Sequence, residues 1–131
     1  TSIASDGPLT VFGVGSPHPR TYGTFARVLG SYVRERNILS LEEAVRKMTS
    51  LPAQILSIQG RGLIKEGYYA DIAIFDPKTI IDKATFEDPH QYAVGVSSVI
   101  VNGVIVVDQG AHNGNKPGKV LRGPGYMENK T

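Results

Sequence analysis

The sequence VSSVIVNGVIVV (residues 96–107) decides the fold of the second half of this chain. It contains two runs of mainly β-branched residues on either side of the dipeptide Asn102-Gly103. An Asn-Gly pair supplies the two positive φ angles that a type I′ turn requires, so this stretch predicts a β-hairpin. Upstream, residues 70–77 (ADIAIFDP) predict another strand that ends at a turn. Downstream, the Gly/Asn/Pro-rich residues 111–118 predict a loop, and residues 119–122 (KVLR) predict a last short strand.

Helical spacing replaces the strand pattern in the first half of the chain. Apolar residues at i, i+3, i+4, i+7 and i+8 form a stripe that predicts one face of a helix. The members of this stripe are Phe25, Val28, Leu29, Tyr32 and Val33. A capping box follows at residues 40–43, in which the Ser40 hydroxyl accepts from the amide of Glu43 and the Glu43 carboxylate reaches back. This box predicts the start of a second helix.

A third helix is predicted to begin near Ser50. Pro52 then lies in its first turn, where the missing N–H group costs nothing. We expect Ile55, Leu56 and Ile58 of this segment to be buried.

The N-terminal segment completes the predicted architecture. Residues 1–5 predict a short strand that ends at Asp6-Gly7. Residues 7–20 contain three glycines and three prolines and predict a loop. The predicted order is therefore strand, loop, helices and a small antiparallel sheet, an α+β arrangement whose two halves join near residues 60–67.

The composition restricts the class of protein. The 131 residues suit one small domain and are too few for a complete (β/α)8 barrel, which needs about 250. The net charge of +2 comes from scattered basic residues, so we expect no nucleic-acid partner. No apolar run approaches the length of a membrane span, which takes about 18 residues. Cysteine is absent, which fits a reducing compartment, and we expect a cytoplasmic location. The chain begins with Thr1, and we expect it to be the last part of a longer protein.

Asp6 is the first candidate for chemistry. A carboxylate at the end of a strand, followed by glycine and a loop, occupies the position at which barrel enzymes keep catalytic groups. There it would act as a general base or face a metal ion, and take a proton from a metal-bound water. The alternative is a side chain that only caps a turn, as Asp before Gly often does.

Arg20 is the second candidate. Proline stiffens the approach to it in the sequence His18-Pro19-Arg20, and its planar guanidinium suits bidentate binding of a carboxylate. The alternative is an ordinary ion pair with a surface acid near the start of a helix.

The histidines predict no metal centre. His18, His90 and His112 form neither a His-x-His motif nor an i, i+4 pair, so we expect no zinc site built within this chain. Each histidine is interpreted as a loop or surface residue. The sequence Gly13-Val14-Gly15 is not followed by the glycine and the helix that a phosphate-binding loop requires.

Several stretches together resemble a known family. They are SDG (residues 5–7), HPR (18–20), YGTFARVLG (22–30), LEEAVRKMT (41–49), RGLI (61–64), GYYADIAIFDP (67–77), ATFE (84–87) and VNG (101–103). They are similar to the C-terminal stretch of the D-aminoacylases, which are the N-acyl-D-amino-acid deacylases of the amidohydrolase superfamily. The resemblance covers nearly the whole chain, up to about Arg122. The stretch at 67–77 is typical of the superfamily, whereas the stretches at 18–20 and 22–30 indicate the deacylases.

The resemblance implies a fold larger than this chain. The family combines a metal-dependent (β/α)8 barrel with a small β-sandwich formed from both chain ends. Residues 1–60 would supply the last barrel strand and the helices after it, and residues 61–131 the C-terminal segment of the β-sandwich domain.

The resemblance also implies roles for the two candidates. Asp6 matches the catalytic aspartate that activates a zinc-bound water, and Arg20 matches the arginine that holds the α-carboxylate of an N-acyl amino acid substrate. The histidine and cysteine ligands of zinc lie upstream of this segment in the family, so we expect no metal ligand within the chain other than Asp6. The loop from Asp6 to Arg20 is longer than the family pattern.

Three functions stay open. The first is the C-terminal part of a zinc-dependent N-acyl-D-amino-acid deacylase, inactive when the chain is alone. The second is another amidohydrolase, acting on cyclic amides. The third is a non-catalytic stand-alone domain for binding or assembly. Because a lone barrel strand and its helices expose apolar faces, we expect the chain to self-associate or to require the missing N-terminal barrel portion.

Overall fold

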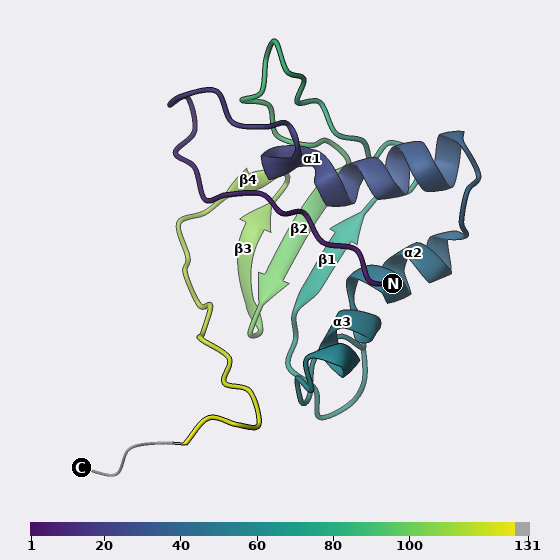
Figure 1. The fold of residues 1–131 in the computed structure, drawn as a ribbon. Coiled ribbons are helices and arrows are strands. Elements are labelled where there is room, and N and C mark those ends of the chain that lie inside the picture. The colour runs from purple at the N-terminus through teal and green to yellow at the C-terminus, as the bar shows by residue number, and fades with distance from the viewer. Residues whose placement is uncertain (128–131) are drawn as a thin grey trace.

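The computed structural model describes residues 1–127, in which the helices precede one antiparallel sheet (Figure 1). The helices are α1 (Arg20–Arg27), the π-helix η1 (Val28–Glu35) that continues it, α2 (Leu41–Met48) and α3 (Ser50–Ile55). The strands are β1 (Ile72–Phe75), β2 (Val96–Val101), β3 (Val104–Asp108) and β4 (Ala111–His112). They lie in the order β1-β2-β3-β4, with each neighbouring pair antiparallel. The predicted mixture of helices and a small antiparallel sheet is confirmed.

The β2–β3 hairpin forms where the Asn-Gly pair predicts it. Asn102 and Gly103 have φ angles of 48° and 80°, as a type I′ turn requires. The turn is also fastened to the segment that joins the two halves of the chain. Arg61 donates to the side-chain oxygen of Asn102 at 2.6 Å and pairs with Asp71, whose carboxylate accepts from the Asn102 backbone amide at 2.8 Å.

The helix formed by α1 and η1 packs closely against the turn that follows β1. The buried core here consists of Ala26, Val28, Leu29, Ala44 and Ile80. A Cβ atom at Gly30 would lie only 2.5 Å from the carbonyl oxygen of Ile80, so this contact between the two backbones requires glycine. Arg34 secures the same contact by donating to the carbonyls of Pro77, at 3.1 Å, and Ile80, at 2.7 Å.

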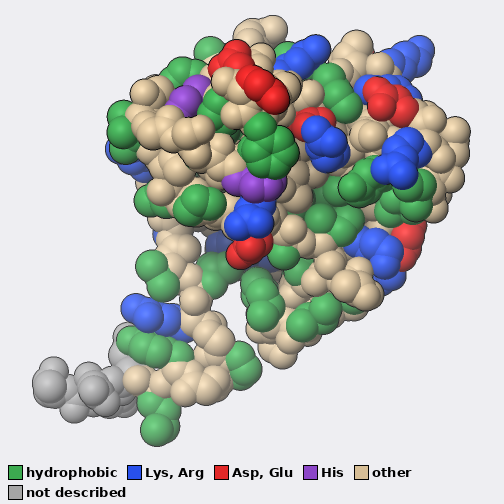
Figure 2. Space-filling view, turned by 45° about the horizontal axis from the view of Figure 1, so that its top comes forward, with side chains coloured by type: hydrophobic (Ala, Val, Ile, Leu, Met, Phe, Trp, Pro, Cys, Tyr) green, Lys and Arg blue, Asp and Glu red, His purple; other side chains and the backbone are tan. Residues whose placement is uncertain are grey.

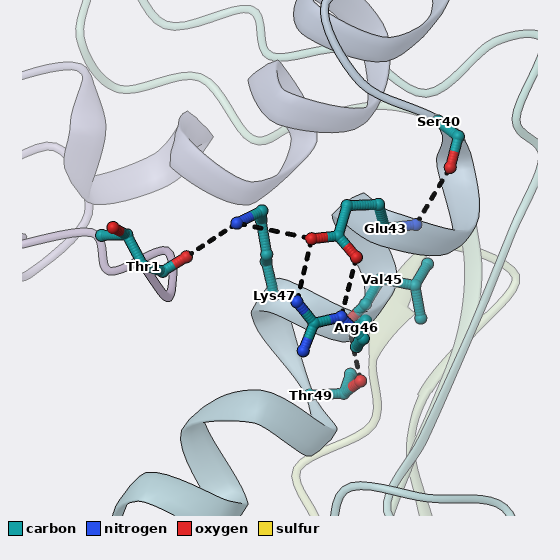
Figure 3. Close-up of polar contacts among 7 residues, drawn as sticks. All are labelled: Thr1, Ser40, Glu43, Val45, Arg46, Lys47 and Thr49. Atoms are coloured by element: carbon teal, nitrogen blue, oxygen red, sulfur yellow. Dashed lines mark hydrogen bonds and ion pairs between the residues drawn. The ribbon is translucent and has the colours of Figure 1, made fainter.

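The predicted capping box of α2 is half present (Figure 3). The amide of Glu43 donates to Ser40 Oγ at 3.2 Å, as predicted. The Glu43 carboxylate accepts instead from Arg46, at 2.7 and 2.9 Å, and pairs with Lys47 at 3.5 Å. These charge-assisted partners are stronger than a backbone amide, and the hydrogen bonds from Arg46 lower the pKa of Glu43 to about 2.

Residues 1–5 do not form the predicted strand. They run past the C-terminal end of α2, where the Ile3 amide donates to the Lys47 carbonyl at 3.1 Å. Lys47 Nζ in turn donates to the Thr1 carbonyl at 3.1 Å (Figure 3). A strand needs a partner strand for its backbone groups. No strand among residues 1–127 pairs with this segment, which explains why the prediction is wrong here.

Two further predictions need correction. Residues 119–122 form no strand, and β4 lies inside the predicted 111–118 loop. β4 is two residues long, so this edge of the sheet offers little backbone for another strand to pair with. Ile55 and Leu56 are 61% and 62% exposed rather than buried, because the short α3 buries only Ala53. Ile58 is half-buried.

Candidate functional site

The structure brings the two candidate residues together. The Arg20 guanidinium lies 3.0 Å from the Asp6 carboxylate, measured from Nη2 to Oδ2. Both side chains are accessible, with 86% of the Asp6 side chain and 42% of the Arg20 side chain exposed. Acidic, basic and histidine side chains lie side by side on the face seen in Figure 2, among hydrophobic ones.

Asp6 is held close to α1 by its own turn. Its backbone adopts a φ of 50°, a left-handed conformation that Asp tolerates better than most residues. The next amide, that of Gly7, donates to Ser5 Oγ at 3.2 Å. A Cβ atom at Gly7 would lie 3.1 Å from Thr21 Cα, so the absence of a side chain lets this turn pack against the first turn of α1.

Arg20 is positioned by the residues before it. α1 begins at Arg20, directly after the buried Pro19. The Arg20 amide donates to His18 Nδ1 at 3.0 Å, and the His18 ring packs edge-on against Phe86 with centroids 4.9 Å apart. His18 therefore anchors the start of α1 to the segment between β1 and β2, and its interpretation as a loop residue is confirmed.

The sequence reasoning missed the contacts that His90 makes next to the two candidates. His90 lies in the segment between β1 and β2 and bonds to the backbone of Gly13 and Gly15, in the loop between Asp6 and Arg20. These partners are 77 and 75 positions away in sequence. The irregular histidine spacing contains no signal for such contacts, because they depend on the tertiary fold.

The geometry allows two kinds of chemistry. An exposed carboxylate can accept a proton, and an exposed guanidinium can bind an anion at two points. Exposed ion pairs contribute only about 0–1 kcal/mol, so Arg20 can exchange Asp6 for another carboxylate at little cost. The described residues contain no group of three or more His, Cys, Asp or Glu that could hold a metal ion.

Comparison with known proteins identifies the family. A model of the amidohydrolase family matches residues 1–107, and the chain belongs to this family. Within it, the chain is similar to D-aminoacylases. A D-aminoacylase from Alcaligenes xylosoxydans xylosoxydans is 50% identical over 105 residues, which are 80% of this chain and 22% of that relative. The chain thus spans about a fifth of the length of the relatives it matches.

Solved structures agree with this similarity. A crystal structure of D-aminoacylase has 48% sequence identity and a TM-score of 0.75, over 76% of this chain and 21% of that one. The N-acyl-D-glutamate deacylase from Bordetella bronchiseptica has 47% identity and a TM-score of 0.69, over 70% of this chain and 19% of that one. The latter was solved with zinc and a phosphonate inhibitor that mimics the tetrahedral intermediate of its reaction.

The helices described for this chain are too short or too polar to cross a membrane.

Proposed function

We propose that the protein containing this chain is a zinc-dependent hydrolase that cleaves the amide bond of N-acyl-D-amino acids. The observation that carries this proposal is the pairing of Asp6 with Arg20 in a chain that is 50% identical to a D-aminoacylase. In this proposal, residues 1–60 complete a (β/α)8 barrel and residues 61–131 contribute to a β-sandwich, and residues 128–131 lie outside the described part.

Asp6 is the proposed catalytic residue. It would take the proton of the attacking water and pass it to the leaving amine, a transfer that one accessible carboxylate can perform. Zinc, held by residues outside this chain, would polarise the amide carbonyl and lower the pKa of the water. Asp6 alone cannot hold the ion, since the described residues supply no set of ligands around it.

Arg20 is the proposed substrate-binding residue. Its guanidinium would leave Asp6 and bind the α-carboxylate of the substrate in a bidentate manner, which frees Asp6 for the proton. Fixing the carboxylate in this way would orient the chiral carbon relative to the attacking water. This role predicts that Arg20 discriminates substrates with a free α-carboxylate from amides that have none.

The test of Asp6 uses the full-length protein. Asp6→Asn should lower kcat by about 10²- to 10⁴-fold, because the amide cannot take the proton. Zinc content, measured by atomic absorption, should stay unchanged. Asp108→Asn, at the exposed end of β3, is the matched control and should retain wild-type turnover. Near-normal turnover in Asp6→Asn would remove Asp6 from the mechanism.

The role of Arg20 is tested by measuring KM and kcat separately in a variant. Arg20→Ala should raise KM for N-acyl amino acids by about 10- to 100-fold, because it removes charge-assisted hydrogen bonds to the substrate. The value of kcat should change less. For the corresponding α-carboxamides, KM should change little. An equal rise for both substrates would contradict the binding role.

A further inference from the structure

One histidine bonds to the backbone of the loop between Asp6 and Arg20 at two points. We call residues 7–19 the connecting loop. His90 Nδ1 lies 3.1 Å from the Gly13 amide, which donates to it, and 3.0 Å from the Tyr22 hydroxyl of α1. His90 Nε2 lies 2.9 Å from the Gly15 carbonyl oxygen. His90 thus bonds to the connecting loop through both ring nitrogens and to α1 through one.

The backbone partners of His90 favour one tautomer of the ring. A backbone amide can only donate, so Nδ1 must accept from Gly13; a carbonyl can only accept, so Nε2 must carry the proton. The two backbone bonds together require hydrogen on Nε2 and none on Nδ1, and the Tyr22 hydroxyl then donates to the same Nδ1 lone pair. In the other tautomer, and in the imidazolium ion, Nδ1 carries a hydrogen that faces the Gly13 amide, and this bond is lost.

An aromatic cluster reinforces the contact. Phe12, in the connecting loop, stacks on Tyr92 with ring centroids 4.8 Å apart and an interplanar angle of 20°. It also packs edge-on against Tyr22 at 6.0 Å and against His90 at 5.6 Å. The ring of Phe12 therefore holds the tip of the connecting loop against α1 and against the segment that carries His90.

We propose that His90, as the neutral Nε2–H tautomer, is a positioning residue that holds the connecting loop against α1 and thereby sets how Arg20 is presented. The path from His90 to Arg20 is short. Gly15 is followed by Pro17 and the buried Pro19, whose rings restrict the backbone, and the His18 ring accepts from the Arg20 amide. Release of Gly13 and Gly15 would therefore free the chain on the N-terminal side of Arg20. The effect on the loop is independent of the proposed function, whereas the effect on substrate binding rests on it.

The first test measures the loop and needs no activity. Long-range ¹H–¹⁵N NMR spectra of the full-length protein, labelled with ¹⁵N at histidine, should show His90 as the Nε2–H tautomer. In His90→Ala, exchange of the Gly13 amide hydrogen should be at least about tenfold faster. His90→Gln should restore slow exchange, because a carboxamide offers one acceptor and one donor with similar spacing. The control is His112→Ala, since His112 lies on β4 and its ring accepts from nearby Gly114.

The second test measures substrate binding in the full-length protein. His90→Ala should raise KM for N-acyl-D-amino acids by about fivefold or more with a smaller change in kcat, and His90→Gln should recover most of the loss. A general loss of stability would instead lower active-enzyme concentration and leave KM unchanged.

The outcomes separate this proposal from the proposed function. The Nδ1–H tautomer in the wild type, or unchanged Gly13 exchange in His90→Ala, would overturn the positioning role. Unchanged KM in an active His90→Ala enzyme would overturn its link to Arg20. If His90→Ala does not fold, the wild-type tautomer and the His90→Gln variant still decide the question. Absence of hydrolysis in the wild type, with the NMR results as expected, would reject the deacylase function and leave the loop contact standing.

Discussion

At the scale of single residues, Asp71 joins the two halves of the chain. Its carboxylate pairs with Arg61, whose side chain is 12% exposed, and accepts from the backbone amide of Asn102. Burial works against the charged form of Asp71, but the hydrogen bonds from Asn102 and Arg61 outweigh it and lower the pKa of this carboxyl. One charged side chain thus stabilises both the hairpin turn and the joint near Arg61.

The prediction for Asp71 concerns stability and its pH dependence. Asp71→Asn should lower the free energy of unfolding by about 1–3 kcal/mol near pH 7, because it removes charge-assisted bonds and leaves Arg61 without its partner. A lowered carboxyl pKa stabilises the fold above the unfolded-state value of about 3.9, and this contribution is lost as pH falls below it. The difference between wild type and variant should therefore shrink between about pH 5 and pH 2.

Urea unfolding at several pH values measures this difference. Asp108→Asn serves as the control and should change the free energy of unfolding by no more than about 0.5 kcal/mol. A wild-type advantage that persists unchanged at low pH would contradict the role given to the Asp71 carboxylate.

At the scale of elements, the contact between η1 and the turn after β1 fixes the helix that carries Arg20. α1 and η1 form one continuous helix, so the position of Arg20 depends on how this helix sits on residues 76–82. Gly30 permits the close approach, and Arg27 adds an ion pair with the nearly buried Asp82 at 2.6 Å.

The packing at Gly30 is tested by whether an alanine there stabilises or destabilises the fold. Helix propensity alone would make Gly30→Ala stabilising by about 1 kcal/mol. Because the new Cβ would lie 2.5 Å from the Ile80 carbonyl oxygen, we expect a destabilisation of roughly 1–3 kcal/mol instead. Gly118→Ala is the control, since its Cβ would meet nothing within 4 Å. The Tm of each variant is measured by thermal unfolding monitored with circular dichroism. A rise in Tm for Gly30→Ala would contradict the packing described.

Local sequence predicts those features whose contacts join residues close together in the chain. The Asn-Gly turn and the Ser40 cap involve residues close in sequence, and both form as predicted. The contacts of His90 and the approach of Gly30 to Ile80 join residues far apart, and no local pattern encodes them. The strand predicted at residues 1–5 fails for a related reason, because its pairing depends on a partner that the described residues do not supply.

At the scale of the whole molecule, many large apolar side chains are exposed to solvent. Ile55, Leu56, Leu63, Ile64 and Tyr69 are each between 52% and 90% exposed. These five exposed large apolar side chains fall between residues 55 and 69, and exposed apolar residues that gather in this way are typical of a contact surface. In our proposal the N-terminal barrel portion covers it, which agrees with a chain that spans 22% of the relative.

The chain alone should therefore self-associate and lack hydrolase activity. Sedimentation velocity at increasing concentration should show species larger than the 14.1 kDa monomer. Leu56→Lys with Ile64→Lys should shift the chain toward the monomer, because the charges oppose burial of this surface. A monodisperse monomer at all concentrations would favour a stand-alone domain.

The most direct measurement compares the two enantiomers of an N-acetyl amino acid as substrates of the full-length protein. We predict zinc-dependent hydrolysis of the D form, with kcat/KM at least about 100-fold above that of the L form. The Asp6→Asn variant should lose this activity. Equal hydrolysis of both enantiomers, or hydrolysis of cyclic amides alone, would contradict the deacylase proposal.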